Sequence, residues 1–228
     1  MYTPTGIPLR DRVDLRQWAS PVENQGHLGS CVSNAIVGAY ELMMNQQAAG
    51  QYKDLSRLFV YYNARFIEST LNEDTGIYLR DGILAIKNKG VCLESLWPYD
   101  ILKYKVEPSP ECYEDAKHRT IKNYYRIDGV DQSLDALNSN RPVVSSISIY
   151  KNFDIITDEN NTLFAPIDLS EESGGHAICL VGYDLPKRML LARNSYGTIW
   201  GMAGYFWLPF EYMKNNTLDQ WVFDIDLN

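Results

Sequence analysis

Cysteine and histidine are scarce in this sequence, and their scarcity limits its chemistry. Four cysteines and three histidines occur in 228 residues, and four cysteines are too few for a disulfide scaffold of this length. Neither residue type shows the close spacing of a zinc site, so we expect no bound metal. Chemistry at a thiol or an imidazole must therefore come from very few candidates.

Basic charge and long apolar runs are also missing. Lys and Arg number 21 against 29 Asp and Glu, which gives a formal charge of -8, and a nucleic-acid groove would need clustered basic residues. No apolar run approaches the ~20 residues of a membrane-spanning helix. Residues 1–12 lack the apolar segment of a signal peptide. We therefore expect no nucleic-acid partner and no membrane span, and either no leader or one that is missing from this chain.

What remains is an ordinary globular composition, 45% apolar and 22% charged, which permits a sizeable core. Helical spacing of apolar residues predicts helices over 32–49, 56–69 and 81–89, the first ended by Gly50 and the last by Gly90. Apolar, β-branched segments predict strands over 141–149, 176–183, 189–193 and 204–208, and the turn after residue 183 predicts a hairpin. The order predicts an α+β fold in one domain, residues 1–228. A mainly helical lobe (about 12–118) would face a mainly antiparallel β lobe (about 119–228) across a cleft.

The segment NQGHLGSCVSNA, residues 24–35, places Cys31 where a helix begins, with Ser30 as a candidate cap. The positive end of a helix dipole favours the thiolate, which is the reactive form of cysteine. The side-chain amide of Gln25, together with the Cys31 backbone N–H, could stabilise a tetrahedral oxyanion. The alternative is a buried structural cysteine, which is the commoner fate of a free thiol.

Three histidines compete to serve this thiol. His27 lies in a glycine-containing loop, and His118 lies in a charged segment that is typical of an exposed helix end. His176 opens an apolar strand after two glycines, and the predicted hairpin brings Asn194 back towards it. A nucleophile, a base and an orienting amide then stand in the order Cys31, His176, Asn194. Without the evidence from Asn194, the alternative for His176 is a structural histidine whose hydrogen bonds are satisfied within the fold.

Four segments in order resemble the papain-like cysteine peptidases. They are VDLR (13–16), SPVENQGHLGSC (20–31), GGHAICLVGYD (174–184) and RNSYGTIWGMAGYFWL (193–208). Within the family, the sequence is most similar to compact microbial members. The shared features are the form NQGxxGSCxxNA of the nucleophile segment (24–35), a GxxxRDG segment (76–82), a WPYD motif (97–100) and a Pro209-Phe210 ending. The resemblance covers most of the chain.

The resemblance implies a papain-like two-lobe fold and a cysteine peptidase that hydrolyses peptide bonds through a thioester acyl-enzyme. Cys31 would be the nucleophile, His176 the acid and base, Asn194 the orienting residue and Gln25 the oxyanion donor. No cofactor is required by this chemistry. The partners would be protein or peptide substrates, with an inhibitory propeptide or a protein inhibitor as a further expectation. We expect a monomer, and a secreted or exported mature enzyme rather than a cytoplasmic one.

The resemblance also assigns substrate contacts, and here the sequence departs from the family pattern. The aligned positions are Gly76, Ile77, Tyr78, Ser146, Gly175, Ala177 and Tyr196, and they imply a mostly apolar main pocket. The alternative for Tyr78 is packing on the helical lobe. Leu28 replaces a disulfide cysteine and Val32 replaces a tryptophan. Tyr196 stands where a tryptophan usually shields the His–Asn pair, so we expect less complete shielding.

Several alternatives stay open at this point. Cys92 and Cys112 could form a disulfide, whereas Cys179 is expected to be a reduced core residue. Asn160 and Asn215 begin N-x-T sequons, which matter only in a secreted setting. The same Cys–His pair could carry transglutaminase or deamidase chemistry on glutamine side chains, or the fold could be a non-catalytic binding module.

Overall fold

The computed structural model describes residues 1–47, 52–164 and 172–227. In these residues the helices are α1 (Cys31–Gln47), α2 (Arg57–Glu68), α3 (Leu79–Lys89), α4 (Pro110–Ala116), α5 (Gly129–Asn138) and α6 (Phe210–Asn216). The strands are β1 (Arg12–Asp14), β2 (Arg119–Arg126), β3 (Val143–Tyr150), β4 (Glu172–Asp184), β5 (Met189–Arg193), β6 (Tyr205–Pro209) and β7 (Thr217–Leu227). The mixture confirms the predicted α+β class.

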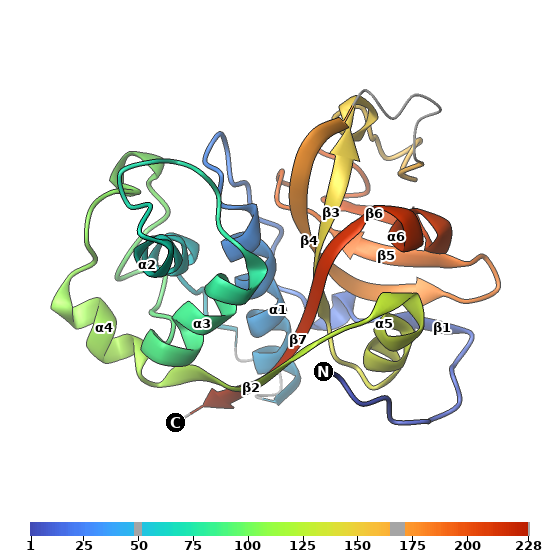
Figure 1. Cartoon of the computed structure of the whole chain (residues 1–228), viewed down its shortest axis with the longest axis horizontal. Helices are drawn as coiled ribbons and strands as arrows, with labels where there is room; N and C mark the ends of the chain where they lie inside the picture. Colours follow the sequence, from blue (N-terminus) through green and yellow to red (C-terminus); the bar gives the residue numbers. More distant parts are fainter. Residues whose placement is uncertain (48–51, 165–171, 228) are drawn as a thin grey trace.

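Helices α1 to α4 gather on one side of the molecule and the sheet lies on the other, so the chain has two lobes (Figure 1). Helix α1 lies between them, and every residue from Val32 to Asn45 is buried. A helix that is buried on all sides needs apolar or small residues all round, which explains its low polarity. This central position fixes the start of α1, at Cys31, at the boundary between the two lobes.

The sheet is antiparallel throughout and has the strand order β2-β7-β3-β4-β5-β6, with β1 paired to β4. Strands β4 and β5 form the hairpin that the sequence predicted, with Cys179 opposite Arg193. Strand β3 lies on the other side of β4, with Ile147 opposite His176. The position of His176 is therefore set by backbone pairing on a buried strand.

Both ends of the chain cross between the lobes. Tyr2 and Thr5, near the N-terminus, bond through their hydroxyls to the carboxylate of Asp135 on α5 in the β lobe. At the other end, β7 carries its last residues towards the helical lobe, where the Tyr40 hydroxyl of α1 donates to the Asp226 carbonyl at 3.3 Å. These crossing segments tie the two walls of the cleft together.

The predicted elements agree with the observed ones to within a few residues. The described part of α1 ends at Gln47, and the predicted helix end at Gly50 lies outside the described residues. Strands β1, β2 and β7 and helices α4 to α6 were not predicted. Their segments are short or mix polar and apolar residues without a strict helical or alternating spacing, so the sequence signal is weak. Within the described ranges, no helix has the length and apolarity that crossing a bilayer requires.

Candidate active site

Cys31 is the first residue of α1 and is half-buried at the junction of the lobes. The Ser30 carbonyl accepts the N–H of Asn34 at 3.0 Å, the first bond of the helix. The Ser30 hydroxyl bonds to the side chains of Tyr99 and Asn34. Gly29 is required by close approach, because a Cβ there would lie 2.9 Å from the Asp74 carboxylate. The backbone before Cys31 is thus tightly surrounded.

His176 and Asn194 meet as predicted, with His176 Nε2 2.8 Å from Asn194 Oδ1. The same Oδ1 accepts the backbone N–H of Ser195 at 2.8 Å. A backbone N–H can only donate, so this atom is the amide oxygen and Nε2 must carry the proton. The other ring nitrogen, Nδ1, is then left for the thiol of Cys31.

Two aromatic rings pack against the imidazole, and a third ring packs on both of them. The ring of Phe153 is centred 5.2 Å from that of His176, and the ring of Tyr196 is centred 5.1 Å from it. Trp200 packs on both of these rings. His176 and Asn194 are only 4% and 3% exposed. The His–Asn pair is thus well covered with a tyrosine at position 196, because the Phe153 ring lies beside the imidazole as well. That a tryptophan would cover it more completely stays a prediction.

The thiol and the imidazole shift each other's pKa. Burial by itself would raise the pKa of Cys31, but the hydrogen bond and charge of His176 and two backbone N–H groups outweigh it, so the pKa is lowered. Burial would lower the pKa of His176, yet its bonds to Cys31 and Asn194 leave that pKa raised. Opposite shifts favour a thiolate–imidazolium pair, whose two protons titrate as a unit.

Gln25, the predicted oxyanion donor, is buried. Its Nε2 donates to the Leu28 carbonyl at 3.0 Å, which uses one of two amide hydrogens. Its Oε1 accepts the Ser195 hydroxyl at 2.6 Å, and its backbone N–H bonds to the Ser195 carbonyl at 2.8 Å. The residue after Asn194 thus holds the predicted oxyanion donor. Sequence reasoning missed Ser195, although its position beside Asn194 is a usable signal.

A groove of about 400 Å³ opens over Cys31 and His176. Six of the seven predicted substrate contacts line it: Gly76, Ile77, Tyr78, Ser146, Gly175 and Ala177. Tyr78 is 74% exposed at the rim, so it does not pack into the helical lobe. Tyr196 is placed against the His176 ring instead.

Three residues that the sequence did not suggest also line the groove: Glu68, Thr70 and Thr75. The Glu68 carboxylate accepts the backbone N–H of Tyr78 at 2.8 Å. The lining is therefore more polar than the expected apolar pocket. No local pattern marks these residues, because they lie at the end of α2 and in the loop that follows it.

The family disulfide is replaced by other contacts. Leu28 is buried against Leu58 and Tyr61. Beside it, the Asp74 carboxylate accepts the Gly29 N–H at 3.0 and 3.1 Å and also accepts the Tyr61 hydroxyl. A carboxylate with several donors can hold two loops together without a covalent bond.

The remaining cysteines and histidines lie away from this chemistry. Cys92, Cys112 and Cys179 are buried free thiols, so the possible Cys92–Cys112 disulfide is not formed. Burial raises the pKa of Cys179 to about 12. His27 and His118 are exposed.

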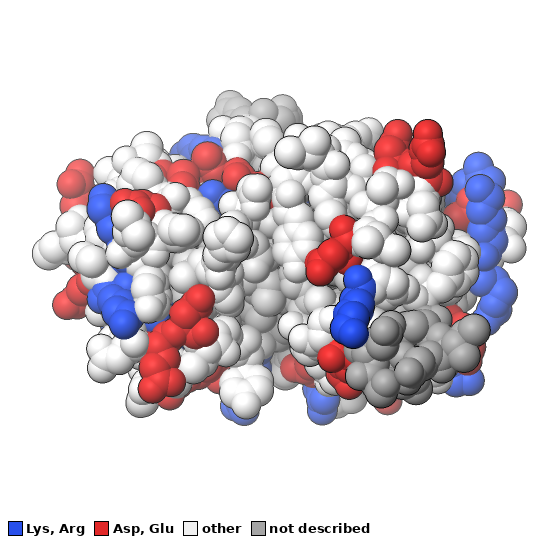
Figure 2. Space-filling model, turned by 90° about the horizontal axis from the view of Figure 1, so that it is seen from above, with Lys and Arg blue, Asp and Glu red and all other residues white. Residues whose placement is uncertain are grey.

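Among the described residues, the other surfaces bring together no second group of catalytic side chains. A larger hollow of about 850 Å³ lies between α5, α6 and β7 and contains neither Cys31 nor His176. The described part of the chain brings together no three His, Cys, Asp or Glu side chains able to hold a metal. The face that is seen from above the groove carries scattered acidic and basic residues, with no continuous basic band among its coloured residues (Figure 2).

Comparison with known proteins places this geometry in a family. The family model described as papain family cysteine protease matches residues 9–220. The crystal structure of xylellain, a cysteine protease from Xylella fastidiosa, is 34% identical with a TM-score of 0.88, covering 100% of this chain and 91% of that one. The similarity to compact microbial members is thereby confirmed. The bromelain protease of Ananas comosus is 20% identical with a TM-score of 0.74, covering 96% of this chain and 100% of that one, and shows the shared fold.

Similar sequences are also described as cysteine peptidases or as like them. An uncharacterized peptidase C1-like protein of Acanthamoeba polyphaga mimivirus is 38% identical over 227 residues, which cover 94% of this chain and 72% of that protein. Cysteine proteinase 3 of Entamoeba histolytica is 25% identical over 212 residues, which cover 87% of this chain and 62% of that protein. With a family match over most of its length and a thiol, an imidazole and an amide gathered at one groove, the chain belongs to the papain family of cysteine proteases.

Proposed function

We propose that the chain hydrolyses peptide bonds with Cys31 as nucleophile, His176 as acid and base, and Asn194 as the orienting residue. The observation that carries the proposal is the geometry of the site, in which His176 is held by Asn194 at 2.8 Å and contacts the thiol at the start of α1. The contact lowers the pKa of Cys31 and raises that of His176. A thiolate beside an imidazolium is a nucleophile that already has a proton donor next to it. The groove above the pair gives a peptide access to both.

The reaction proceeds in two halves. The Cys31 thiolate attacks the peptide carbonyl carbon, and the resulting oxyanion is stabilised by the Gln25 side-chain amide and the Cys31 backbone N–H. His176 gives its proton to the leaving nitrogen, the C–N bond breaks, and a thioester remains. Water then gives a proton to His176 and attacks the thioester, which releases the acid and restores the thiolate–imidazolium pair.

Asn194 contributes through geometry. Its amide oxygen accepts the Nε2 proton of His176, so the Nδ1 edge of the ring faces the sulfur. The enclosing rings exclude water from this bond, which strengthens it. Asn194 therefore orients the ring so that the Nδ1 proton can be transferred, while the Nε2 proton stays on His176.

The substrate would be a peptide segment in the groove, with Gly76, Ile77 and Tyr78 on one side and Ser146, Gly175 and Ala177 on the other. An inhibitory propeptide or a protein inhibitor would act by filling the same groove, and the enzyme would work as a monomer.

The test is hydrolysis of a fluorogenic peptide panel with and without a thiol-directed epoxide. We expect turnover that the epoxide abolishes, and none from Cys31→Ala with an unchanged melting temperature, because the half-buried sulfur leaves little cavity. Mass spectrometry of a treated protein mixture should find new chain termini. Deamidated or cross-linked glutamines without new termini would favour deamidase or transglutaminase chemistry instead. Turnover by Cys31→Ala would refute the assignment.

A further inference from the structure

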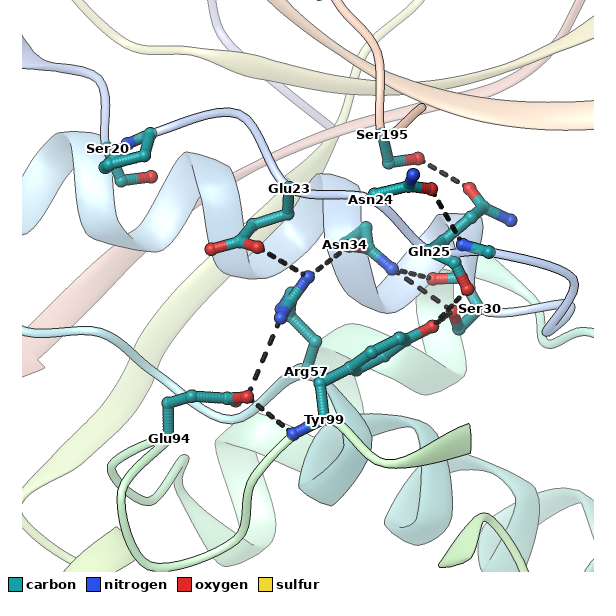
Figure 3. A network of polar contacts seen from close by, with 12 residues as sticks. Ser20, Glu23, Asn24, Gln25, Ser30, Asn34, Arg57, Glu94, Tyr99 and Ser195 are labelled. Atoms are coloured by element: carbon teal, nitrogen blue, oxygen red, sulfur yellow. Dashed lines mark hydrogen bonds and ion pairs between the residues drawn. The ribbon is translucent and has the colours of Figure 1, made fainter. Parts of the chain in front are cut away.

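Two residues in the motifs of this sequence have no role in the reaction described above. Asn34 belongs to the segment that follows Cys31, and Tyr99 belongs to the WPYD motif. The Tyr99 hydroxyl donates to the backbone carbonyl of Gln25 at 2.9 Å and also bonds to the Ser30 hydroxyl (Figure 3). One phenol therefore contacts the backbone of the predicted oxyanion donor and the residue that precedes Cys31.

The direction of these bonds follows from counting protons. Tyr99 has one hydroxyl proton, and a carbonyl can only accept, so that proton goes to Gln25. The Ser30 hydroxyl must then donate to the Tyr99 oxygen. The Ser30 oxygen in turn accepts from Asn34 Nδ2 at 3.1 Å. Burial raises the pKa of the Tyr99 phenol, which keeps its proton in place at neutral pH.

The far end of this series is anchored by Arg57. Its Nη1 donates to Asn34 Oδ1 at 3.2 Å, which fixes the amide with its nitrogen towards Ser30. The guanidinium pairs with Glu23 at 3.2 Å and lies 4.3 Å from the centre of the Tyr99 ring. These contacts hold the buried arginine in place, because losing one of them would leave its charge poorly compensated away from water.

Glu94 links Arg57 to Tyr99 a second time. Its Oε1 accepts the Tyr99 backbone N–H at 2.5 Å and lies 3.7 Å from Arg57 Nη2. We call the ordered series Arg57, Asn34, Ser30, Tyr99 and Gln25 the hydrogen-bond path. Every bond in it points the same way, so each one polarises the next. The path draws on α2, on α1 and the loop before it, and on the loop after α3, and it ends at the backbone carbonyl of Gln25 (Figure 3).

We propose that Tyr99 is a positioning residue, which holds the Gln25 carbonyl and Ser30 so that the two oxyanion donors keep a fixed separation. The proposal rests on the function proposed above. Gln25 supplies one donor from its side chain and Cys31 supplies the other from its backbone, on opposite ends of residues 25–31. The Tyr99 hydroxyl bridges that loop close to both ends. Freeing the loop would blur a geometry that matters only once the oxyanion forms.

The first experiment compares wild type with Tyr99→Phe, which removes the hydroxyl and keeps the ring under Arg57. Two rates are measured: hydrolysis of a peptide amide, which passes through an oxyanion, and alkylation of Cys31 by iodoacetamide, which displaces iodide without one. We expect kcat to fall by about tenfold, the size of one net hydrogen bond, with KM nearly unchanged. The alkylation rate and its pH profile should stay as in wild type.

A matched control and a second variant keep the test sharp. Tyr113→Phe removes a phenol that bonds to Asn63 at 3.2 Å in the helical lobe, away from the groove, and it should change neither rate. Ser30→Ala interrupts the hydrogen-bond path in the middle, so it should lower kcat as well. The double variant should be little worse than Tyr99→Phe alone, because both changes break one path.

The outcomes separate the two proposals. An active wild type with an unimpaired, folded Tyr99→Phe would overturn the positioning role alone. A parallel fall in hydrolysis and alkylation would also overturn it, because the hydroxyl would then support the whole site. Additive losses in the double variant would contradict the path. A wild type that hydrolyses no peptide would overturn the proposed function, and the positioning role with it.

Discussion

The two walls of the groove hold their reactive groups by different means. On the β wall, His176 is placed by the ladder of β3 and β4 and packed between Phe153 and Tyr196. On the helical wall, Cys31 and Gln25 lie in and beside a loop that is held by side-chain bonds to Tyr99 and Asp74. One wall is set by backbone register and apolar packing, and the other by buried polar contacts.

The difference has consequences for tolerance. The stability that apolar packing contributes falls gradually as side-chain volume is removed. A buried polar group that loses its partner instead destabilises the fold by its full desolvation penalty. Backbone register resists side-chain changes, so the β wall should keep its geometry unless a core ring is removed. The helical wall should respond to single hydroxyl or amide deletions.

The largest expected effect is on the β wall. His176→Ala should lower kcat/KM by more than about 10³-fold, the scale seen when one member of a catalytic set is removed. His27→Ala and His118→Ala should remain close to wild type, because both side chains are exposed to solvent whereas His176 is buried against Asn194. The measurement is fluorogenic hydrolysis with each purified variant. An inactive His27→Ala would show that the base is misassigned.

A smaller loss is expected at the helical wall. Gln25→Ala should lower kcat by roughly 10²-fold, as for the loss of one oxyanion donor, with a smaller effect on KM. The amide contacts charge that exists only in the transition state. Steady-state kinetics on one peptide amide measures both constants. Unchanged kcat would mean that another group supplies the donor.

Removing a ring tests whether packing holds the β wall. Phe153→Ala should lower the free energy of unfolding by about 3–5 kcal/mol, as for other buried aromatic truncations, and should slow alkylation of Cys31 by iodoacetamide. Phe59→Ala, which truncates an equally buried ring in the helical lobe, should cost similar stability without slowing alkylation. Denaturant melts and alkylation rates separate the two. Equal alkylation rates for both variants would remove the packing argument.

The pH dependence of kcat/KM should reflect the contact between Cys31 on the helical wall and His176 on the β wall. Because the pKa of Cys31 is lowered and that of His176 is raised, the reactive ion pair should form below the ordinary thiol pKa and persist above the ordinary imidazole pKa. A bell-shaped kcat/KM profile is expected, rising on the acid side as the thiolate forms and falling on the alkaline side as His176 loses its proton. Tyr196→Trp should move the alkaline limb little, since the His–Asn bond is already covered. A single alkaline rise near the free thiol pKa would show that no resting ion pair forms.

The smallest effect concerns a buried carboxyl behind the helical wall. Burial raises the pKa of Glu41 to about 7 from an ordinary value of 4.5, against hydrogen bonds from Ser20 and Leu55 and the charge of Arg193. Between these pH values the folded protein keeps a proton that the unfolded chain releases, so the free energy of unfolding should fall as pH rises. Glu41→Gln should flatten that slope, and exposed Glu111→Gln should not. Melting temperatures at a series of pH values measure it. An unchanged slope in Glu41→Gln would contradict the raised pKa.

Local sequence determined much of the site. The glycine-flanked start of a buried helix marks Cys31, and an apolar strand, a tight turn and a second strand predict the hairpin that brings His176 to Asn194. Both features depend on periodicity and turn chemistry within short segments, which a single sequence displays. The aligned groove residues were found by resemblance, and six of the seven line the groove.

Tertiary structure alone decided the rest. Phe153 meets His176, Asp74 meets Gly29, and Tyr99 meets Gln25 across separations that leave no trace in local periodicity. Tyr196 shows the same limit, since the cover of the His–Asn pair depends on Phe153 and on the packing of Trp200 as well as on Tyr196 itself. The sequence by itself determined which groups could react and on which elements they lie. Only the folded chain decided how they are held, because side-chain contacts between distant segments exist only after the lobes have packed.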